Sequence, residues 1–374
     1  MINGVMIMRE YASKTLRAVG YGGVVLLLLF CMTDTASTAA AVGESINKCM
    51  NIVIPSLYAM LVVSSLFIRS GVNGLFPRRA GKLTRAVFGM ESSIFPIFTF
   101  SMVAGYPVGV KMLCDEYSAG RLSKHRAELL SGLCFGAGPA FVFGCISRQL
   151  YSSDRAGLVI LISNVSANFI LAFIMSFALR KTAQEQPRRK SSGVSAEMFT
   201  DCVLRSGRAM ADICIMVVFF SVFAAFLSRI GAAAAGELLE KLPDLDRNSG
   251  EVIVAALLDV TNIGKLPRGD WLLLPYVSGA SAFGGGCVMF QVAAITAGRF
   301  SLKPFILLRC AAAVLSYFIC RLIIPLFMET ETVAVSAVKV SGMSSKSPVP
   351  SVMLILMTVM LMLEFGKKET KKAA

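Results

Sequence analysis

Asp259 is the residue whose type and position most strongly suggest chemistry. It lies in the apolar stretch Val252–Asn262, two residues before Thr261. A carboxylate at membrane depth is costly and usually faces a cavity or a charged partner. The Thr261 hydroxyl and the Asn262 amide can hydrogen-bond an oxygen-rich ligand. We therefore predict a solute site at which Asp259 takes up a proton or a cation. The alternative is a solvated Asp259 on a short exterior helix.

The segment Phe100–Lys111, FSMVAGYPVGVK, is the second place where the sequence suggests a site. Pro107 lacks a backbone N–H and, together with Gly105 and Gly109, makes a continuous helix unfavourable. Irregular backbone at membrane depth is tolerated only where protein buries it or where it lines a cavity. Broken helices of this kind hold the substrate in transporters. We predict a substrate site here, with Lys111 either attracting an anionic solute or extending to the lipid headgroups.

Further polar residues and glycines complete the predicted site. The Tyr106 ring can stack on a planar heteroaromatic solute. Asn168 lies in the middle of an apolar run, where it either binds solute or holds two helices together. The residues predicted to bind the solute are Gly105, Tyr106, Pro107, Gly109, Lys111, Gly136, Gly138, Pro139, Asn168, Asp259, Thr261, Asn262, Gly284, Gly285 and Gln291. Arg309, near one end of another apolar run, is expected to reach the headgroups.

The sequence disfavours catalysis, metal binding and nucleic-acid binding. His125 is the only histidine and lies in a charged segment, so no nucleophile–base pair can be built around it. The ten cysteines are scattered without a C-x-x-C pair, which is typical of buried apolar fillers. We therefore expect no enzyme activity, no cofactor and no metal. The net charge of +14 is spread over short basic clusters between apolar runs, a pattern of membrane topology rather than of nucleic-acid binding.

Apolar runs long enough to cross a membrane recur along the chain. Hydrophobic residues make up 55% of the sequence, and mean hydropathy is +0.69. A membrane-spanning helix needs about 20 mostly apolar residues. We predict about eight spans, at Ala18–Met32, Ile52–Phe67, Leu129–Ile146, Ala156–Leu179, Ala211–Phe226, Leu272–Ala294, Pro304–Phe327 and Val352–Leu363. The apolar segments Ile94–Val110 and Val252–Asn262 are predicted to enter and leave the membrane on one side.

Basic clusters set the expected orientation, because Lys and Arg gather in cytoplasmic loops. Such clusters precede the first predicted span, follow the second, occupy residues 180–190 and end the chain. They place both termini in the cytoplasm if Ile94–Val110 re-enters from the inside and Val252–Asn262 from the outside. Two alternatives stay open: Ile94–Val110 crosses the membrane once, or Ala18–Met32 is a signal peptide that is cleaved.

The two halves of the chain resemble each other. The segment Ser131–Phe143, SGLCFGAGPAFVF, aligns without gaps with Ser278–Phe290, SGASAFGGGCVMF. In each half a span is followed by a broken segment, the aligned segment and a further span. This order predicts an inverted repeat with a solute site between matching broken helices, and chance similarity among Gly- and Ala-rich helices is the alternative.

The predicted organisation follows from this repeat. It consists of residues 1–43, an N-terminal span and exterior segment; 44–180, the first repeat; 181–200, a cytoplasmic linker; 201–328, the inverted second repeat; and 329–374, an exterior linker and C-terminal span.

Three segments of the chain resemble one protein family. They are GYPVGVK at Gly105–Lys111, LDVTN at Leu258–Asn262 and AFGGGCVMFQV at Ala282–Val292. In this order they are similar to segments of the YlbJ-type sporulation integral membrane proteins, which carry two copies of the nucleoside-recognition, or Gate, domain. The resemblance covers most of Ile52–Phe327. The chain departs from the family at Gly136–Phe141, GAGPAF, where a T/S-N-P-type segment is expected, and at Asp259, where the family has Glu.

The resemblance implies an inverted-repeat fold similar to concentrative nucleoside transporters. It also implies a role in spore formation, in moving dipicolinic acid from the mother cell toward the forespore. The expected location is then a multi-pass position in the cell membrane, in a membrane derived from the mother cell.

Together these inferences predict an all-α polytopic membrane protein with an inverted repeat and re-entrant or broken helices. Its expected function is transport of a small solute, anionic or heteroaromatic, with a proton or cation as coupling ion. The alternative is a membrane scaffold that does not transport and is needed for assembly of the spore cortex or coat. The expected partners are the solute, the coupling ion and the lipid bilayer; no oligomeric state follows from the sequence.

Overall fold

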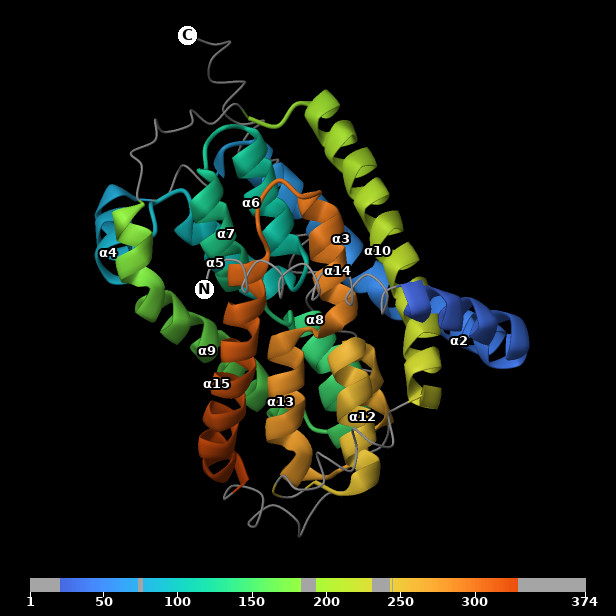
Figure 1. Ribbon diagram of the computed structural model, residues 1–374. Helices are drawn as coiled ribbons and strands as arrows, with labels where there is room; N and C mark the ends of the chain where they lie inside the picture. The colour runs from blue at the N-terminus through green and yellow to red at the C-terminus, as the bar shows by residue number, and fades with distance from the viewer. Residues whose placement is uncertain (1–20, 73–76, 183–192, 231–242, 244, 329–374) are drawn as a thin grey trace, which may run out of the picture.

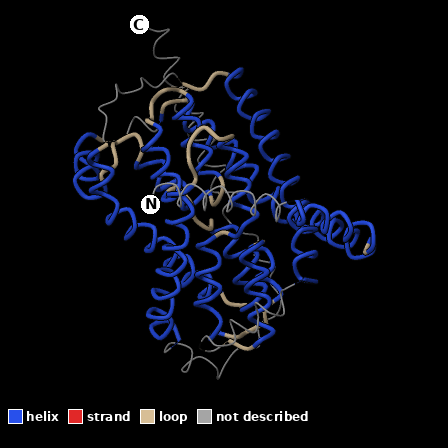
Figure 2. The backbone as a smooth tube through the Cα atoms, in the orientation of Figure 1, coloured by secondary structure: helices blue, strands red, loops and turns tan. Residues whose placement is uncertain are grey.

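The computed structural model describes residues 21–72, 77–182, 193–230, 243 and 245–328. Within these residues the protein is all-helical, and helices run through most of its length without a strand (Figures 1 and 2). The prediction of an all-α fold is therefore confirmed. The predicted span Val352–Leu363 and the linker that precedes it lie outside the described residues.

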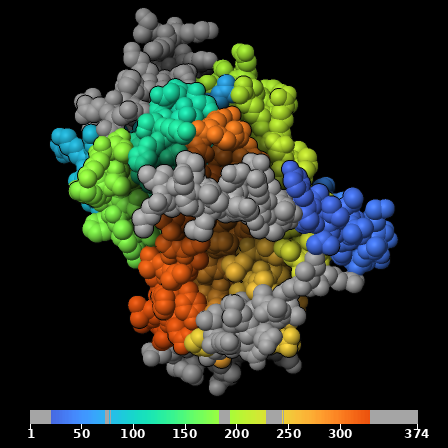
Figure 3. Space-filling model, in the orientation of Figure 1, coloured from blue at the N-terminus to red at the C-terminus, as the bar shows by residue number. Residues whose placement is uncertain are grey.

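The first half of the chain contains two long helices and several short ones between them. They are an N-terminal helix at Tyr21–Thr33, α2 (Thr35–Lys48), the π-helical segment η1 (Cys49–Val53), α3 (Ile54–Arg69), α4 (Arg78–Phe88), α5 (Phe95–Ala104), α6 (Val108–Ser118), α7 (Lys124–Leu133), α8 (Pro139–Phe141), the π-helical segment η3 (Val142–Tyr151) and α9 (Asp154–Lys181). The stretch from α2 through η1 to α3 forms one continuous helical path, and α2 projects from the side of the bundle (Figures 1 and 3).

The second half repeats this order with fewer elements. They are α10 (Ala196–Ile230), α12 (Arg247–Leu258), the 3-10 helices η4 (Val260–Lys265) and η5 (Trp271–Leu273), α13 (Leu274–Phe283), α14 (Gly285–Thr296) and α15 (Lys303–Met328). In both halves, short interrupted helices lie between two long ones.

Among the described residues, five helical stretches are long and apolar enough to cross a membrane, which makes this a multi-pass membrane protein. They are Thr35–Arg69, Asp154–Lys181, Ala196–Leu227, Trp271–Thr296 and Lys303–Phe327. Each contains one of the predicted spans. The outer face of α15 suits lipid, because Leu307, Leu322 and Leu326 are 72%, 77% and 71% exposed.

The prediction of one continuous span at Leu129–Ile146 is wrong. The helix α7 ends at Leu133 and helical structure resumes only at Pro139. The intervening residues Cys134–Gly138 contain two glycines, and Pro139 occupies a first-turn position, where its missing N–H costs nothing. The apolar composition of this segment therefore indicated a buried helical region but not the interruption of the helix.

Similar interruptions occur at three further places. The chain leaves helical geometry at Gly105–Pro107 between α5 and α6, at Asp259 between α12 and η4, and at Gly284 between α13 and α14. Gly105 and Gly284 have φ angles of 79° and 87°, a conformation that favours glycine. The glycines and the proline that predicted a broken segment at Gly105–Gly109 thus coincide with a break.

The two ends of the α5–α6 pair lie at the same end of the bundle. The buried Arg126 on α7 donates to the Glu91 carboxylate at 2.6 Å, just before α5, and to the carbonyl of Gly89. Glu116, near the end of α6, accepts two hydrogen bonds of 2.8 Å from Arg121, just before α7. The start of α5 and the end of α6 therefore both lie beside the start of α7, which is at the upper end in Figure 1. The α5–α6 pair therefore begins and ends at the same end of the bundle.

The α12–η4 pair is arranged in the same way at the opposite, lower end of Figure 1. The Tyr276 hydroxyl on α13 donates to the carbonyl of Pro243, which precedes α12. The backbone N–H of Gly269, which follows η4, donates to the carbonyl of Leu150 at 2.7 Å. The two pairs thus enter the bundle from opposite ends and reach its centre.

Candidate functional site

The four helix interruptions meet at the centre of the molecule. A methyl group on Gly138 would lie 2.9 Å from the Cα atom of Gly105, so these two breaks touch backbone to backbone. A methyl group on Gly285 would lie 3.0 Å from the backbone nitrogen of Val260, and one on Gly284 would collide with the ring of Phe135. Glycine is required at these positions because two segments of the chain approach each other more closely than a side chain permits.

A cavity lies where these breaks meet, and we call it the inner cavity. It encloses about 630 Å³, including the part that is open to its surroundings. Its walls come from the breaks and from α3, α10 and α14. The predicted site residues that line it are Gly105, Tyr106, Gly138, Asp259, Thr261 and Gln291.

Asp259 supplies the charge of the inner cavity. It is 3% exposed, and among the described lining residues it alone carries a charge. One carboxylate oxygen accepts the backbone N–H of Thr261 at 3.1 Å, and the other accepts the Thr261 hydroxyl at 2.9 Å. Both bonds come from the turn that ends α12, so no basic side chain compensates the charge within this turn. The Asp259 carboxylate is therefore held at the cavity by contacts within its own turn.

Tyr106 presents an unused polar group at the same cavity. Its ring stacks on the Phe135 ring with a centroid distance of 4.9 Å and an angle of 19° between the planes. Its side chain is 8% exposed, and its hydroxyl has no hydrogen-bond partner among the described residues. A buried hydroxyl without a partner is costly, and this one belongs to a residue that lines the cavity.

Arg309 is the main structural residue that the sequence did not reveal. It does not extend to the headgroups as predicted, because its side chain is completely buried on α15. It donates to the carbonyl of Phe135 at 2.9 Å, to the carbonyl of Ala282 at 3.4 Å and to the Asn168 amide oxygen at 2.8 Å. Its guanidinium carbon also lies 5.2 Å from the centroid of the Phe135 ring.

The two carbonyls that Arg309 binds have equivalent positions in the two halves. Phe135 aligns with Ala282 in the ungapped alignment of Ser131–Phe143 with Ser278–Phe290. Both carbonyls are close to a point where a helix breaks off, where carbonyl groups lose their helical partners. One guanidinium thus satisfies both breaks and ties the two halves together. No sequence motif signals this role, because the partners of Arg309 are backbone atoms.

Asn168 lies behind the inner cavity rather than in its lining. Its amide nitrogen donates to the carbonyl of Phe135 at 3.1 Å, and its amide oxygen accepts from Arg309. One turn earlier, Asn164 donates to the Ser281 hydroxyl at 3.0 Å and accepts from the Ser316 hydroxyl at 2.6 Å. These bonds link α9, α13 and α15, as expected for polar residues that hold membrane helices together.

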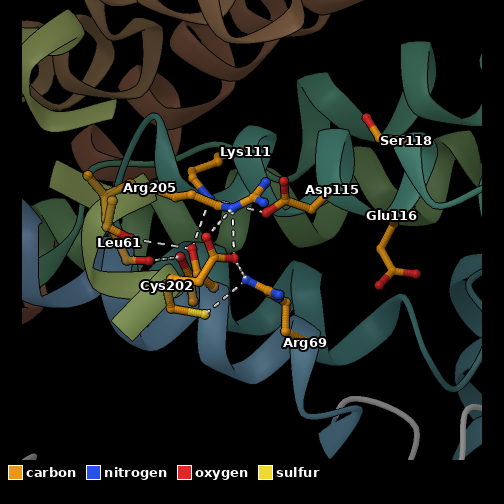
Figure 4. Close-up of polar contacts among 12 residues, drawn as sticks. Leu61, Arg69, Lys111, Asp115, Glu116, Ser118, Cys202 and Arg205 are labelled. Atoms are coloured by element: carbon orange, nitrogen blue, oxygen red, sulfur yellow. Dashed lines mark hydrogen bonds and ion pairs between the residues drawn. The ribbon is translucent and has the colours of Figure 1, made fainter. Parts of the chain in front are cut away.

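Lys111 faces away from the inner cavity. Its ammonium group donates to the Ser65 hydroxyl on α3 at 2.9 Å and to the Asp115 carboxylate at 3.1 Å (Figure 4). Arg69 on α3 and Arg205 on α10 bind Asp201 next to this contact. Lys111 therefore belongs to a polar cluster between α3, α6 and α10, one helical turn beyond the break.

The other predicted residues support the breaks from outside the cavity lining. Gly109 packs against the carbonyl of Cys134, and Gly136 lies beside the amide of Asn168. Asn262 donates its amide to the carbonyl of Ala255 at 3.3 Å. Pro107 and Pro139 begin the helical segments that follow two of the breaks. Gly284 and Gly285 form the break before α14.

The residues of the apolar wall of the cavity were not predicted from the sequence. This wall consists of Ile52, Val53, Leu57, Ile213 and Val217 from α3, α10 and η1, with Val288 from α14. Such residues are indistinguishable in sequence from those that face lipid or pack in the core. Across the described residues, no three His, Cys, Asp or Glu side chains gather closely enough to hold a metal ion.

Comparisons of the chain with models of known protein families, with curated proteins and with solved structures gave no match.

Proposed function

We propose that this protein is a membrane transporter for a small solute, which binds between the broken helices of two inverted halves. The observation that supports this proposal most directly is the inner cavity. Three helix breaks contribute to its lining, at Gly105–Tyr106, Gly138 and Asp259, and the Asp259 carboxylate is buried there. Broken helices that meet at the middle of a membrane are the sites of solute and ion binding in secondary transporters.

We take the solute to be a small organic anion with a planar heteroaromatic part. The aromatic pair Tyr106–Phe135 offers a flat surface beside an unused hydroxyl. The resemblance to YlbJ-type proteins points to dipicolinic acid. Because Lys111 faces away from the cavity and Asp259 is negative, the anion requires a proton or cation at Asp259 to enter together with it.

The orientation in the membrane follows from the basic residues at the upper end of Figure 1. Arg85, Arg121, Lys124 and Arg180 belong to α4, α7, α9 and the loop before α7 at this end. By the positive-inside rule, this end is the cytoplasmic one. The α5–α6 pair then enters from the cytoplasm and the α12–η4 pair from the outside.

Uptake by purified protein in liposomes tests the proposal. The assay follows labelled dipicolinate and related heteroaromatic carboxylates under an imposed proton or sodium gradient. We expect uptake by the wild-type protein and its loss in Asp259→Asn, which keeps the shape of the side chain and removes its charge. Asp154→Asn is the matched control, because Asp154 is an exposed acid that pairs with Arg148 outside the cavity.

Normal uptake by correctly inserted Asp259→Asn protein across a range of pH would refute the coupling role. A wild-type protein that moves none of these solutes would refute the choice of solute. If the wild-type protein moved none of these solutes and the Asp259→Asn variant restored spore formation to a strain that lacks the protein, the scaffold alternative would be favoured instead.

A further inference from the structure

A second cavity adjoins the inner cavity on the side of η3 and η4, and we call it the outer vestibule. Its polar lining residues are Glu44, Lys48, Gln149 and Lys265. The two cavities share Ile52, Val53, Phe141, Val260 and Thr261 as lining residues. The two cavities are therefore adjacent, and these mostly apolar residues form the wall between them. Phe141 is the largest of the shared side chains and lies 6.1 Å, ring to ring, from Tyr106.

The outer vestibule is flanked by both π-helical segments that the structure describes. Ile52 and Val53 come from η1, and Cys145, Ile146 and Gln149 come from η3. π-helical turns are rare and unfavourable and occur frequently at functional sites. Two such segments that face each other across one opening are an indication, independent of charge, that this opening is used.

The charges of the two cavities are opposite in sign. In the outer vestibule, Lys48 forms an ion pair of 2.8 Å with Glu44. Lys265 is exposed, and no acid lies within ion-pair distance of it among the described residues. The vestibule therefore carries a net positive charge, from Lys265. The inner cavity carries the negative charge of Asp259.

We propose that the outer vestibule is the entrance through which an organic anion reaches the inner cavity, with Lys265 as the residue that attracts it and Phe141 as the side chain that separates the two spaces. A positive charge at the mouth of an apolar passage raises the local concentration of anions. The choice of an organic anion rests on the proposed function, whereas the route itself does not, and its test requires no transport.

Two native cysteines make this route measurable. Cys145 lines the outer vestibule and Cys287 lines the inner cavity. Two variants, each keeping one of these cysteines and no other, are reconstituted in liposomes. They are treated with membrane-impermeant methanethiosulfonates that carry either a sulfonate or a trimethylammonium group. For each site we take the ratio of the anionic to the cationic reaction rate, corrected with a free thiol, because this ratio cancels the reactivity of the thiol itself.

We expect the anionic reagent to be favoured at Cys145 by about fivefold, the effect of one nearby charge in water. We expect the cationic reagent to be favoured at Cys287, which reacts more slowly. Lys265→Gln should abolish the preference at Cys145. Lys303→Gln, which removes an exposed lysine at the start of α15, is the matched control and should leave it unchanged. An unchanged ratio in Lys265→Gln, or a cationic preference at Cys145, would overturn the proposal.

The role of Phe141 has its own readout. Phe141→Ala should accelerate the modification of Cys287 from the vestibule side, whereas the rate at Cys145 should change little. Equal rates at Cys287 in both proteins would refute Phe141 as the barrier. The expected labelling without any uptake would support the route and refute the transport proposal. Uptake with the opposite labelling pattern would support transport and refute the route.

Discussion

The two helix pairs that reach the centre of the molecule use their polar residues differently. In the α5–α6 pair, the charged residue nearest the break is Lys111, which binds Ser65 and Asp115 away from the cavity. In the α12–η4 pair, the charged residue is Asp259, which occupies the break itself and lines the cavity. The first pair therefore uses its charge for packing between helices, and the second uses it at the site.

The backbone of the two breaks differs in the same sense. Gly105 lies against Gly138, and Gly109 lies against the carbonyl of Cys134, so the first break is a tightly packed seam between elements of the first half. The second break is short, and the chain returns as the single 3-10 helix η4, whose residues line both cavities. The first break is therefore closely packed, whereas the second leaves a carboxylate at the cavity.

The largest effect is expected from Arg309, which holds both halves. Arg309→Leu leaves the carbonyl of Ala282 and the amide oxygen of Asn168 without this donor. Each buried acceptor left unpaired costs about 1–3 kcal/mol, so we expect a much lower melting temperature in detergent and a poor yield of folded protein. Arg321→Leu on the same helix is the control, because Arg321 is exposed. A melting temperature equal to that of the wild type would show that the two breaks hold together without the guanidinium.

The next effect concerns the seam of the first half. Gly138→Ala places a methyl group 2.9 Å from the backbone nitrogen and the Cα atom of Gly105, and neither can give way easily. We expect a loss of about 1–3 kcal/mol of stability, measured as a lower melting temperature, together with reduced uptake. Gly144→Ala on η3 adds the same methyl group where no atom lies within 4 Å, and it should be tolerated. Equal behaviour of the two variants would contradict the tight seam.

A smaller effect is expected at Tyr106 and separates its ring from its hydroxyl. Tyr106→Phe keeps the stack on Phe135 and removes a hydroxyl that has no protein partner among the described residues. Stability should therefore be unchanged or slightly higher, while KM for the solute should rise about threefold to tenfold if the hydroxyl binds it. Tyr106→Ala, which also removes the stacking surface, should weaken uptake further. An unchanged KM in Tyr106→Phe would leave the ring as the only contribution of this residue.

The smallest effect is expected at Lys111. Lys111→Met keeps most of the side-chain volume and removes the contacts with Ser65 and Asp115. Because Asp115 is 42% exposed, the loss of this ion pair should cost less than about 1 kcal/mol. KM for an anionic solute should stay within about twofold of the wild-type value, because Lys111 faces away from the cavity. A strong rise in KM would place Lys111 at the solute, and both helix pairs would then have a charged residue at the site.

Several features of this protein could be predicted because they depend on local chemistry. Glycine and proline at Gly105–Gly109 disfavour a helix wherever they occur, and the break lies there. The apolar runs at Ala156–Leu179 and Pro304–Phe327 form long helices because their length and composition suit a bilayer. Asp259 lines the inner cavity, in agreement with the expectation that a carboxylate in an apolar stretch faces one.

Other features could not be predicted because they depend on which helix faces which. The sequence around Cys134–Gly138 is as apolar as a span, and its glycines were not predicted to break the helix; in the structure this segment packs against Gly105 and its Phe135 carbonyl accepts from Arg309. Lys111 and Asp259 both stand beside a break in the sequence, yet one faces α3 and the other the cavity. The direction of a side chain on a helix is fixed by packing against neighbours that the local sequence does not name.

The sequence by itself determined that this chain belongs in a membrane, that its helix breaks at Gly105–Gly109, and that Asp259 faces a cavity. The tertiary structure alone decided that one buried arginine joins the breaks of both halves, and that a positively charged vestibule adjoins the negatively charged inner cavity. The physical reason is the nature of the partners. Composition and backbone propensity act along the chain. The carbonyl groups that Arg309 binds and the apolar side chains that enclose the cavities come instead from distant segments.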